Sequence, residues 1–332
     1  MKDEVQLQGD ILSKANVVGF RKKITKKQVK GNPTEDDCIR VYVSGKKPVT
    51  HLAVEDVLPT EIDGLKVDVF DLGGKPSIHT VAHPERYRPI VPGCSIGSFS
   101  KPTGTFGWVA SKDGKLWVDS CAHVFAKYPH RESPISPIIL QPGRVDGGKF
   151  FDDFLSLYEW HEPVKPKYPI HDYPLSPWNR FKKRLGLLKE PEVPDGWVPP
   201  LNYQDYAVAK LQKPVDDTVE LRTLDFEVLG EYDLVGKVMA GTMLTSVVCK
   251  VKYQQKAGYD PYMVDVAEIH EDDYLGKSGR TTGFKTHWTI DDSAQLTVDY
   301  GYMDAVFDDV AITWCISQPG DSGASVWKKR DW

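Results

Sequence analysis

The chain has 332 residues and a mass of 37.4 kDa, which is too long for one ordinary hydrophobic core and predicts two or three domains. It carries 42 Lys and Arg against 47 Asp and Glu, and the resulting net charge of −5 argues against a protein that mainly binds nucleic acid. Hydrophobic residues make up 40 % and charged residues 27 %, which is ordinary for a globular chain and excludes a fibre or a disordered tail.

The cysteines and the absence of long apolar stretches indicate the cellular setting. No Cys-x-x-Cys pair occurs, so neither a disulfide framework nor a zinc site is predicted from the five cysteines Cys38, Cys94, Cys121, Cys249 and Cys315. The first six residues are polar and lead into no apolar segment of a signal peptide. No stretch approaches the roughly 20 apolar residues that span a bilayer. We therefore expect a cytoplasmic protein with no membrane association, no cofactor and no metal.

Residues 1–80 have the pattern of a small α+β module. Helix-like or strand-like spacing occurs in five short segments, namely 5–15 and 50–59 for helices and 16–20, 38–43 and 65–70 for strands. A run of lysines between residues 22 and 30 is a candidate contact for a phosphate backbone. The acidic total charge favours a solvated hairpin tip instead.

From about residue 81 the chain consists of short β-like runs separated by turn residues. Residues 105–110 and 115–118, joined by a Lys-Asp-Gly turn, have the pattern of a β-hairpin. Further strand-like runs lie at 154–158, 206–211, 286–290, 295–300, 310–315 and 324–327. Such a series predicts a closed or sandwiched all-β architecture. Residues 161–200 contain nine prolines and are expected to form an inserted surface loop.

The sequence Gly-Asp-Ser-Gly at 320–323 is a candidate nucleophile motif. A serine hydroxyl needs a base to remove its proton and backbone donors for the oxyanion that forms on the attacked carbonyl. Gly320 allows the backbone to turn so that the N–H groups of Gly320 and Ser322 point into one pocket. The motif alone is equally compatible with an ordinary turn.

A histidine and an aspartate accompany this serine in a consistent order. His123 follows directly after a predicted strand, and Asp205 lies just before another. Each alone would be taken as a structural or turn residue. Three such residues in the order His, Asp, Ser, each beside a strand, favour a shared catalytic site.

These motifs resemble those of the trypsin-like serine peptidases of the chymotrypsin fold, over most of the chain. The sequence Gly-Arg-Thr-Thr-Gly at 279–283 looks like a second-barrel motif of prokaryotic-type cytoplasmic members, which often begin with a small α/β module. The resemblance implies a mainly β fold in which two six-stranded barrels meet at a cleft, after a small α+β domain at 1–80. The first barrel would span residues 81–215 and the second residues 216–332.

The resemblance also implies a mechanism and site residues. Ser322 would attack a peptide carbonyl, His123 would accept the proton, and Asp205 would orient the imidazole. The N–H groups of Gly320 and Ser322 would form the oxyanion hole. Ile316, six residues before the nucleophile, would form the floor of the specificity pocket and favour an apolar or small side chain in the polypeptide substrate.

One further expectation concerns Asp321, the residue before the nucleophile. In family members made as zymogens, the corresponding aspartate pairs with a newly cut N-terminus. The sequence has nothing that resembles a cleavage-activation site. We therefore expect Asp321 to have an internal partner.

The sequence departs from the family pattern at its C-terminal end. Only ten residues follow Ser322, whereas the family fold has further strands there, one of which lines the specificity pocket. We therefore expect an unclosed edge in the second barrel. A C-terminal truncation, strands supplied by a partner and a degenerate domain are three open explanations. The alternative function is a catalytically silent binding module that recruits a protein partner through residues 1–80.

Two other clusters are considered for chemistry. The sequence His-Glu-Asp-Asp at 270–273 could bind a cation, but a solvated loop is favoured because no second ligand group stands at metal spacing. Cys121 lies two residues before His123 and is interpreted as a buried small residue rather than a nucleophile.

Overall fold

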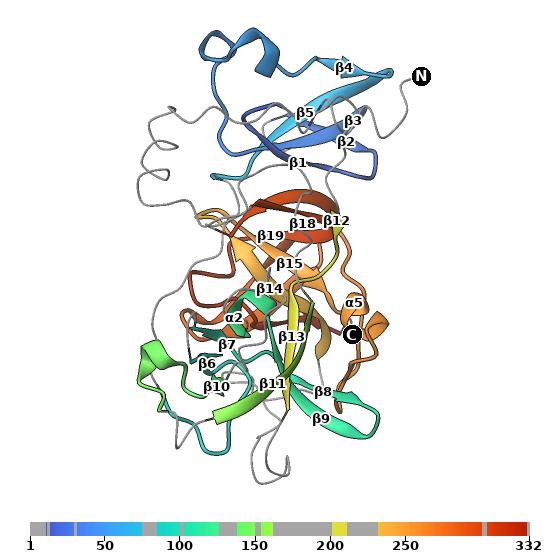
Figure 1. The fold of residues 1–332 in the computed structure, drawn as a ribbon. Coiled ribbons are helices and arrows are strands. Elements are labelled where there is room, and N and C mark those ends of the chain that lie inside the picture. The colour runs from blue at the N-terminus through green and yellow to red at the C-terminus, as the bar shows by residue number, and fades with distance from the viewer. Residues whose placement is uncertain are drawn as a thin grey trace, which may run out of the picture.

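The computed structural model describes most of the chain, and all structural statements refer to the residues that it describes. These are residue 11 and residues 14–29, 32–74, 85–99, 103–125, 138–149, 154–161, 201–210, 232–300 and 304–330. Figure 1 shows three stacked regions, with the N-terminal strands in blue at the top, a barrel in orange and red in the middle and a green barrel below. This mainly β architecture confirms the predicted fold class.

The green barrel is built from strands between residues 95 and 210. In chain order they are β6 (Ser95–Ser98), β7 (Thr103–Thr105), β8 (Val109–Lys112), β9 (Lys115–Ser120), β10 (Ile138–Leu140), β11 (Phe154–His161) and β13 (Tyr206–Lys210). They pair in the order β8-β9-β13-β11-β10-β6-β7. Because β7 and β8 are successive parts of one extended segment, the sheet closes on itself. In this segment Phe106 N donates to Cys94 O and Gly107 N donates to Asp119 O, both at 2.9 Å.

The hairpin β8–β9 confirms the prediction from the Lys-Asp-Gly turn. Val109 pairs with Val118 and Lys112 with Lys115, which leaves Asp113 and Gly114 as the two turn residues. Both have positive φ, 52° and 70° respectively. Two successive positive φ angles match the right-handed twist of the strands, and Asp-Gly is a favoured pair for them.

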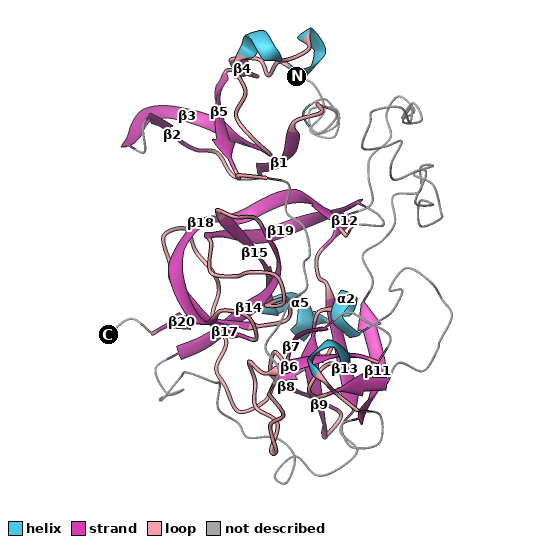
Figure 2. Cartoon of the chain, turned by 90° about the vertical axis from the view of Figure 1, so that its left-hand side faces the viewer, coloured by secondary structure: helices cyan, strands magenta, loops and turns pink. Residues whose placement is uncertain are grey.

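The second barrel is built from strands between residues 232 and 329. They are β14 (Tyr232–Gly241), β15 (Thr245–Lys250), β17 (Tyr274–Gly279), β18 (Gly283–Asp299), β19 (Asp304–Trp314) and β20 (Ser325–Lys329). The order is β19-β15-β14-β20-β17-β18, and β18 also pairs with β19, so the ring is closed (Figure 2). Two of the predicted strands, 286–290 and 295–300, are parts of the single long strand β18, which bends through several bulges.

The expectation of an unclosed edge in this barrel is wrong for the described strands. β20, the strand after Ser322, pairs with β14 on one side and β17 on the other. β15 pairs with β14 and β19 and completes the ring. The ring is thus completed by strands that come before Ser322 in the chain, namely β14, β15, β17, β18 and β19, together with β20 after it. Spatial adjacency, rather than chain order, determines whether a barrel closes.

The N-terminal strands extend the sheet of the second barrel. They are β1 (Val17–Arg21), β2 (Thr25–Val29), β3 (Asn32–Val43), β4 (Glu61–Ile62) and β5 (Leu65–Asp71). β1 pairs with β18, with Phe20 opposite Gln295, and β3 and β5 follow outward. Two short 3-10 turns, η1 (Val49–His51) and η2 (Val54–Asp56), occupy half of the helix-like segment 50–59. The helix predicted at 5–15 lies largely outside the described residues.

Two lysines of the predicted run, Lys22 and Lys23, lie in the turn between β1 and β2 and face carboxylates of this same protein. Lys22 Nζ lies 2.9 Å from Asp308 Oδ2, and Lys23 Nζ lies 3.0 Å from Asp292 Oδ2, both in the second barrel. Arg21 adds a bidentate contact to Glu271, at 2.8 and 2.7 Å. These ion pairs fix the N-terminal strands to the barrel.

Buried contacts join the two barrels. Trp108 of the first barrel and Trp327 of the second pack edge to face, with ring centroids 5.0 Å apart. Lys237 Nζ lies 2.6 Å from Asp119 Oδ2, in a second contact between the barrels. Apolar packing and a buried ion pair therefore hold the two halves in one geometry.

Short elements complete the described chain. They are α2 (Ala122–Phe125), η3 (Arg144–Asp146), β12 (Leu201–Asn202), α5 (Val251–Lys256) and β16 (Asp260–Pro261). β12 pairs in parallel with β19, and β16 pairs with β8. The proline-rich insertion predicted at 161–200 lies outside the described residues except for His161. Within the described ranges, no helix is long and apolar enough to cross a membrane.

Candidate active site

His123 and Asp205 are brought together by the pairing of β9 with β13. These strands are antiparallel, with Ser120 opposite Ala207, so the residues after β9 lie beside the residues before β13. His123 stands in the short helix α2 and is 3 % exposed, and Asp205 is 1 % exposed. The sequence pattern therefore identified two strand ends that the fold places side by side.

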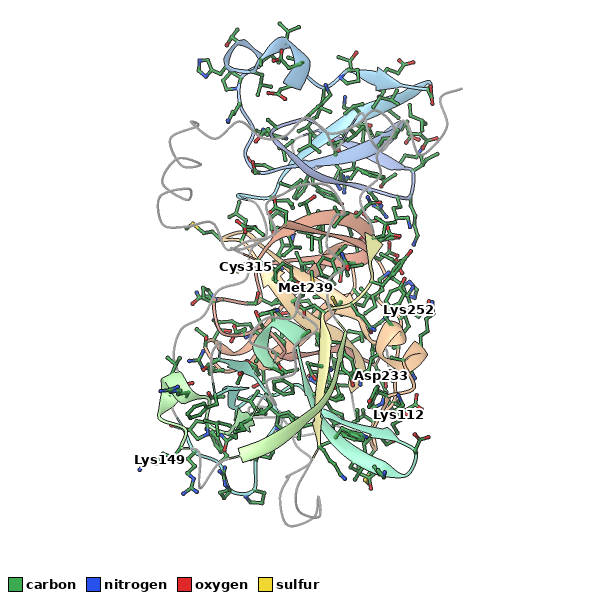
Figure 3. All side chains as sticks on the ribbon, in the orientation of Figure 1. Lys112, Lys149, Asp233, Met239, Lys252 and Cys315 are labelled. Atoms are coloured by element: carbon green, nitrogen blue, oxygen red, sulfur yellow. The ribbon has the colours of Figure 1, made fainter. Side chains whose placement is uncertain are left out.

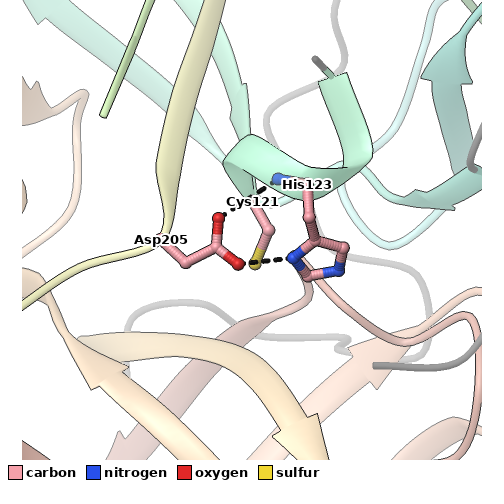
Figure 4. Close-up of side chains that lie close together, drawn as sticks. All are labelled: Cys121, His123 and Asp205. Atoms are coloured by element: carbon pink, nitrogen blue, oxygen red, sulfur yellow. Dashed lines mark hydrogen bonds and ion pairs between the residues drawn. The ribbon is translucent and has the colours of Figure 1, made fainter. Parts of the chain in front are cut away.

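The carboxylate of Asp205 holds His123 through two hydrogen bonds (Figure 4). Asp205 Oδ2 contacts the imidazole Nδ1, and Asp205 Oδ1 accepts a hydrogen bond from the His123 backbone N at 3.2 Å. A carboxylate bonded to Nδ1 fixes the tautomer in which Nε2 is unprotonated in the neutral ring. That Nε2 is buried and has no hydrogen-bond partner among the described residues. The pair therefore presents a free basic nitrogen.

Tyr300, which the sequence analysis did not identify, is a third member of this group. Its hydroxyl donates to Asp205 Oδ2 at 2.8 Å, and its ring packs edge to face on the His123 ring, with centroids 5.7 Å apart. Burial and the nearby Asp205 carboxylate raise the pKa of Tyr300 well above its usual value, so the hydroxyl keeps its proton and remains a donor. Tyr300 follows β18 of the second barrel and lies 95 residues from Asp205 in the sequence, so no local sequence motif predicts the contact.

Ser322 lies in a tight turn between β19 and β20. Gly320 and Gly323 on either side have φ of 98° and 94°, a backbone region that favours glycine. A Cβ at Gly323 would lie 2.1 Å from Ser120 Oγ, so the motif glycine is also required by close packing against the first barrel. The Gly-Asp-Ser-Gly sequence thus specifies the shape of the turn.

The nucleophile turn and the histidine segment meet at β7. Ser322 O accepts a hydrogen bond from Thr105 N at 2.9 Å. A Cβ at Gly104 would lie 2.7 Å from Ser322 O and 2.5 Å from a side-chain methyl of Val124, the neighbour of His123. The fold therefore packs both segments against Gly104, and Gly104 has no room for a side chain.

The Ser322 hydroxyl has a different partner from the one expected. Ser322 Oγ donates to the carbonyl of Met239 at 3.2 Å, and His123 Nε2 is left without a bond in the described residues. The structure thus assembles the His–Asp half of the predicted triad, while the serine hydroxyl is bonded to β14. Rotation about the Ser322 side-chain bond is needed to direct the hydroxyl to a base.

The two backbone amides predicted for the oxyanion hole have no acceptor among the described residues. Neither Gly320 N nor Ser322 N donates a hydrogen bond within the described part of the chain. The Gly320 carbonyl is held by Thr105 Oγ1, which donates to it at 2.9 Å. The Thr105 hydroxyl therefore holds the turn through the Gly320 carbonyl. The amides of Gly320 and Ser322 take no part in this contact.

Asp321 has the internal partner that the sequence analysis expected, and that partner is Lys277. Lys277 Nζ lies 2.8 Å from Asp321 Oδ2, and neither side chain is exposed to solvent. Burial lowers the pKa of Lys277, and the charge of Asp321 opposes this lowering. A buried ion pair thus anchors the residue before the nucleophile.

The Gly-Arg-Thr-Thr-Gly motif at 279–283 completes this anchor. Thr281 N and Thr282 Oγ1 donate to the Asp321 carboxylate at 2.8 and 2.7 Å. A Cβ at Gly279 would lie 2.5 Å from Asp321 Oδ1, so only glycine fits there. Arg280 makes a bidentate contact to Asp146 of the first barrel, with both N–O distances 2.7 Å. The motif therefore positions the nucleophile turn and joins the barrels.

A cavity of about 420 Å³ opens beside Ser322. Its walls come from the end of β14, from the segment between β19 and β20, and from the turn after β5. Figure 3 labels Met239 of β14 and Cys315, the residue after β19; Cys315 lines the cavity. No described residue of the lining has a charged side chain.

Ile316 does not line this cavity. Its side chain is 1 % exposed and packs in an apolar cluster with Val248 and Leu275 inside the second barrel. Its neighbours Cys315 and Ser317 line the cavity instead. The structure therefore does not place Ile316 at the pocket floor, because the backbone directs alternate side chains to opposite sides.

The other candidate clusters have structural partners. Cys121 lies within 4.8 Å of the ligand atoms of His123 and Asp205, but its Sγ donates to Val238 O at 3.3 Å. Burial raises the pKa of Cys121 well above its usual value, so the thiolate that a metal requires is disfavoured. In the acidic loop 270–273, the Glu271 carboxylate contacts Arg21, as described above. Asp273 Oδ1 lies 2.9 Å from Lys328 Nζ.

Comparisons with known proteins give distant similarities only. No family model and no curated protein matches the chain. Thermobifida fusca protease A aligns with 11 % identity and a TM-score of 0.34, over 71 % of this chain and 76 % of that one. Nocardiopsis protease aligns with 10 % identity and a TM-score of 0.34, over 73 % of this chain and 92 % of that one. Because similarity at this level carries no argument, the proposals below rest on the strand pairings and the site geometry.

Proposed function

We propose that the protein is a serine endopeptidase that hydrolyses peptide bonds with Ser322, His123 and Asp205. The single observation that carries the proposal is the buried His–Asp pair with an unpartnered Nε2 at the junction where the Ser322 turn packs. Supporting features are the positive-φ glycines around Ser322 and the two free amides of Gly320 and Ser322. The five cysteines are unpaired thiols, which supports the proposed cytoplasmic setting.

The first half of the proposed reaction forms an acyl-enzyme. The Ser322 hydroxyl turns from the Met239 carbonyl toward His123, Oγ bonds to the substrate carbonyl carbon, and the hydroxyl proton moves to Nε2. The carbonyl oxygen becomes an oxyanion that accepts from the amides of Gly320 and Ser322, each worth about 3 kcal/mol in comparable sites. The C–N bond then breaks, and Nε2 returns the proton to the leaving amine.

Water completes the proposed reaction. It gives one proton to Nε2 and attacks the acyl carbon, the bond to Ser322 Oγ breaks, and the proton returns to the serine. Asp205 remains ionised throughout, and the hydrogen bond from Tyr300 helps to hold it in place while the imidazolium is present. No cofactor or metal is required for this sequence of steps.

A fluorophosphonate probe tests the assignment, because it forms a covalent bond only with an activated serine. We expect the full chain to be labelled on the peptide that contains Ser322, with labelling lost in Ser322→Ala and His123→Ala. Ser111→Ala, in the β8–β9 hairpin, is the matched control and should label normally. Labelling that persists in Ser322→Ala would contradict the proposal.

The second candidate is a catalytically silent binding module that recruits a protein partner through residues 1–80. The observation that favours it is the bond from Ser322 Oγ to Met239 O in place of one to His123. A folded wild-type protein that takes up no probe and cleaves no denatured protein substrate would establish this alternative. Specific labelling at Ser322 would reject it.

A further inference from the structure

We propose that residues 72–74, at the end of the N-terminal strands, form part of the substrate pocket and limit the size of the side chain that it accepts. The substrate class inferred is a polypeptide with an uncharged apolar side chain at the cleaved position. This inference rests on the proposed function and deepens it. It assigns the N-terminal strands a role in recognition within the same chain.

Residues at the end of the N-terminal strands line the cavity beside Ser322. Gly73 and Gly74 line the same cavity of about 420 Å³ as Ser322, together with Ala240 and Gly241 of β14. Cavities of a few hundred Å³ are large enough to bury an amino-acid side chain. The N-terminal strands therefore contribute a wall to the space in which a substrate side chain would lie.

This wall is rigidly attached to the strand behind the nucleophile. Leu72 is fully buried and belongs to the same apolar cluster as Met239 and Ala240. Its carbonyl accepts a hydrogen bond from Thr242 Oγ1 at 2.7 Å, and its N donates to Val43 O at 3.0 Å. Met239 is the residue whose carbonyl holds the Ser322 hydroxyl. Residues 72–74 are thus fixed relative to the catalytic serine.

Gly74 keeps its side of the cavity open. Its φ is 146°, which L-residues rarely adopt, and a Cβ there would meet only Thr242, at 3.9 Å, a residue that also lines the cavity. A Cβ at Gly73 would instead lie 2.6 Å from Leu244 Cδ1, outside the cavity lining. The available space therefore depends on Gly74 remaining glycine.

The attachment of the N-terminal strands to the barrel does not depend on this wall. β1 pairs directly with β18, and Lys22 and Lys23 bind carboxylates of the barrel. The wall can therefore be altered without releasing the N-terminal strands. A change in binding can then be attributed to the cavity and not to loss of the fold.

The lining also defines the chemistry of the side chain. Val238, Ala240 and Met243 supply apolar surface, and Ser317 and Gln318 supply neutral polar groups. With no charged side chain in the described lining, a lysine or aspartate of the substrate would lose its hydration without gaining an ionic partner. An aliphatic or aromatic side chain gains burial of apolar surface at no such cost.

The test compares Gly74→Ala with Gly64→Ala. Both glycines lie in the N-terminal region with positive φ, but a Cβ at Gly64 would meet nothing within 4 Å, so that variant controls for backbone strain. Each change is made in the full chain carrying Ser322→Ala, which cannot turn over. Binding is measured by calorimetry for five tripeptide amides that differ only in one residue, Ala, Leu, Phe, Lys or Asp.

We expect Gly74→Ala to weaken binding of the Leu and Phe peptides about tenfold and the Ala peptide less than twofold. Gly64→Ala should leave all three unchanged, and the Lys and Asp peptides should bind more weakly than the Leu peptide to every variant. Identical profiles for the two glycine variants would overturn the inference, as would failure of the parent to bind any peptide. The fluorophosphonate test of the proposed function uses no peptide, so the two can fail separately.

A second pair of variants guards against a folding defect in Gly74→Ala. Thr242→Val removes the hydrogen bond to Leu72 O, whereas Thr242→Ser keeps the hydroxyl. We expect Thr242→Val to reduce the preference for Leu over Ala, because the wall is no longer tied to β14, and Thr242→Ser to retain it. Equal preference in both variants would contradict a fixed wall at residues 72–74.

Discussion

Lys277 and Asp321 form an ion pair inside the second barrel, with 2.8 Å between Nζ and Oδ2 and no exposure of either side chain. Asp321 immediately precedes Ser322, so this pair fixes the turn that carries the proposed nucleophile and the proposed oxyanion donors. Lys277 lies in β17, two residues before the Gly-Arg-Thr-Thr-Gly motif whose threonines bind the same carboxylate. The interior of the barrel thus supplies the cation that orders the turn.

Removing this cation is expected to disable the site and destabilise the fold. Lys277→Met leaves the Asp321 carboxylate buried without its ionic partner, which costs about 3–5 kcal/mol in comparable cases. Urea unfolding measures that loss of stability, and the rate of fluorophosphonate labelling shows whether the Ser322 turn keeps its conformation. Lys285→Met, an exposed lysine on β18, is the control and should change both by little. Normal labelling of a folded Lys277→Met protein would contradict this role.

The same pair predicts the alkaline limit of activity. Because burial lowers the pKa of Lys277 below its ordinary 10.5, the ammonium in the folded protein loses its proton before a free lysine does. As pH rises through this lowered pKa, the ion pair is lost and labelling of Ser322 should fall. Lys277→Arg keeps its charge and should remove the fall. An identical decline in both proteins would show that another group is responsible.

The free energy of unfolding should change with pH in the opposite direction from the labelling of Ser322. Between the lowered pKa of Lys277 and 10.5, the unfolded chain binds more protons at this position than the folded one. The free energy of unfolding contributed by this group therefore rises with pH in that window. Urea unfolding at several alkaline pH values, compared between the wild type and Lys277→Arg, measures the contribution.

Tyr300 is expected to position the His–Asp pair. Tyr300→Phe removes the hydrogen bond to Asp205 but keeps the ring against His123, and a bond to a charged group is worth about 1.5–3 kcal/mol. We expect labelling of Ser322 to slow at least about tenfold, with a changed pH profile. Tyr42→Phe removes a comparable buried bond, to Asp291, and should lower stability without changing the labelling rate. Equal labelling of the two variants would contradict a positioning role.

Arg280 and Asp146 are expected to hold the two barrels together at the cleft. Their side chains are 0 % and 2 % exposed, so Arg280→Met should destabilise the fold by about 3–5 kcal/mol in urea unfolding. Arg330→Met breaks solvent-exposed pairs with Asp233 and Asp265 and should cost much less, because water screens such pairs. Similar losses in the two variants would show that the contact between the barrels does not depend on Arg280.

Cys315 and Cys121 should differ in reactivity. Cys315 is partly exposed and lines the cavity, whereas Cys121 is fully buried and keeps its proton. Brief treatment with iodoacetamide should modify Cys315 and not Cys121, as read by mass spectrometry, and should weaken peptide binding in the Ser322→Ala protein. Cys315→Ser should bind peptide and resist the reagent. Modification that leaves binding unchanged would place Cys315 outside the substrate pocket.

Local sequence patterns predicted most of the strands and the order of the site residues. Asp113 and Gly114 specified the β8–β9 turn because their backbone angles are a local property. His123 and Asp205 were recognised because each stands at the end of a strand, and antiparallel pairing brings such ends together. Gly320 and Gly323 likewise indicated the turn around Ser322, since few other residues adopt its angles.

The sequence-based predictions that were wrong concerned contacts between distant segments of the chain. The open edge predicted from the ten residues after Ser322 followed chain order, whereas five strands from earlier positions close the ring with β20. Ile316 was placed in the pocket by its spacing from Ser322, but its side chain points into the barrel core. Spacing along a chain gives the position of a residue and does not give the side to which it points.

By itself, then, the sequence determined the β-rich fold class, the turns and the residue types available for acyl-transfer chemistry, because backbone preference and alternation act over a few residues. Only the tertiary structure decided which residues complete the site, including Tyr300 on Asp205, Lys277 on Asp321 and the wall at residues 72–74. Those contacts join positions 44 to about 250 residues apart. These contacts form because closure of the two barrels buries the residues next to one another. No local sequence pattern predicts which distant residues will become neighbours.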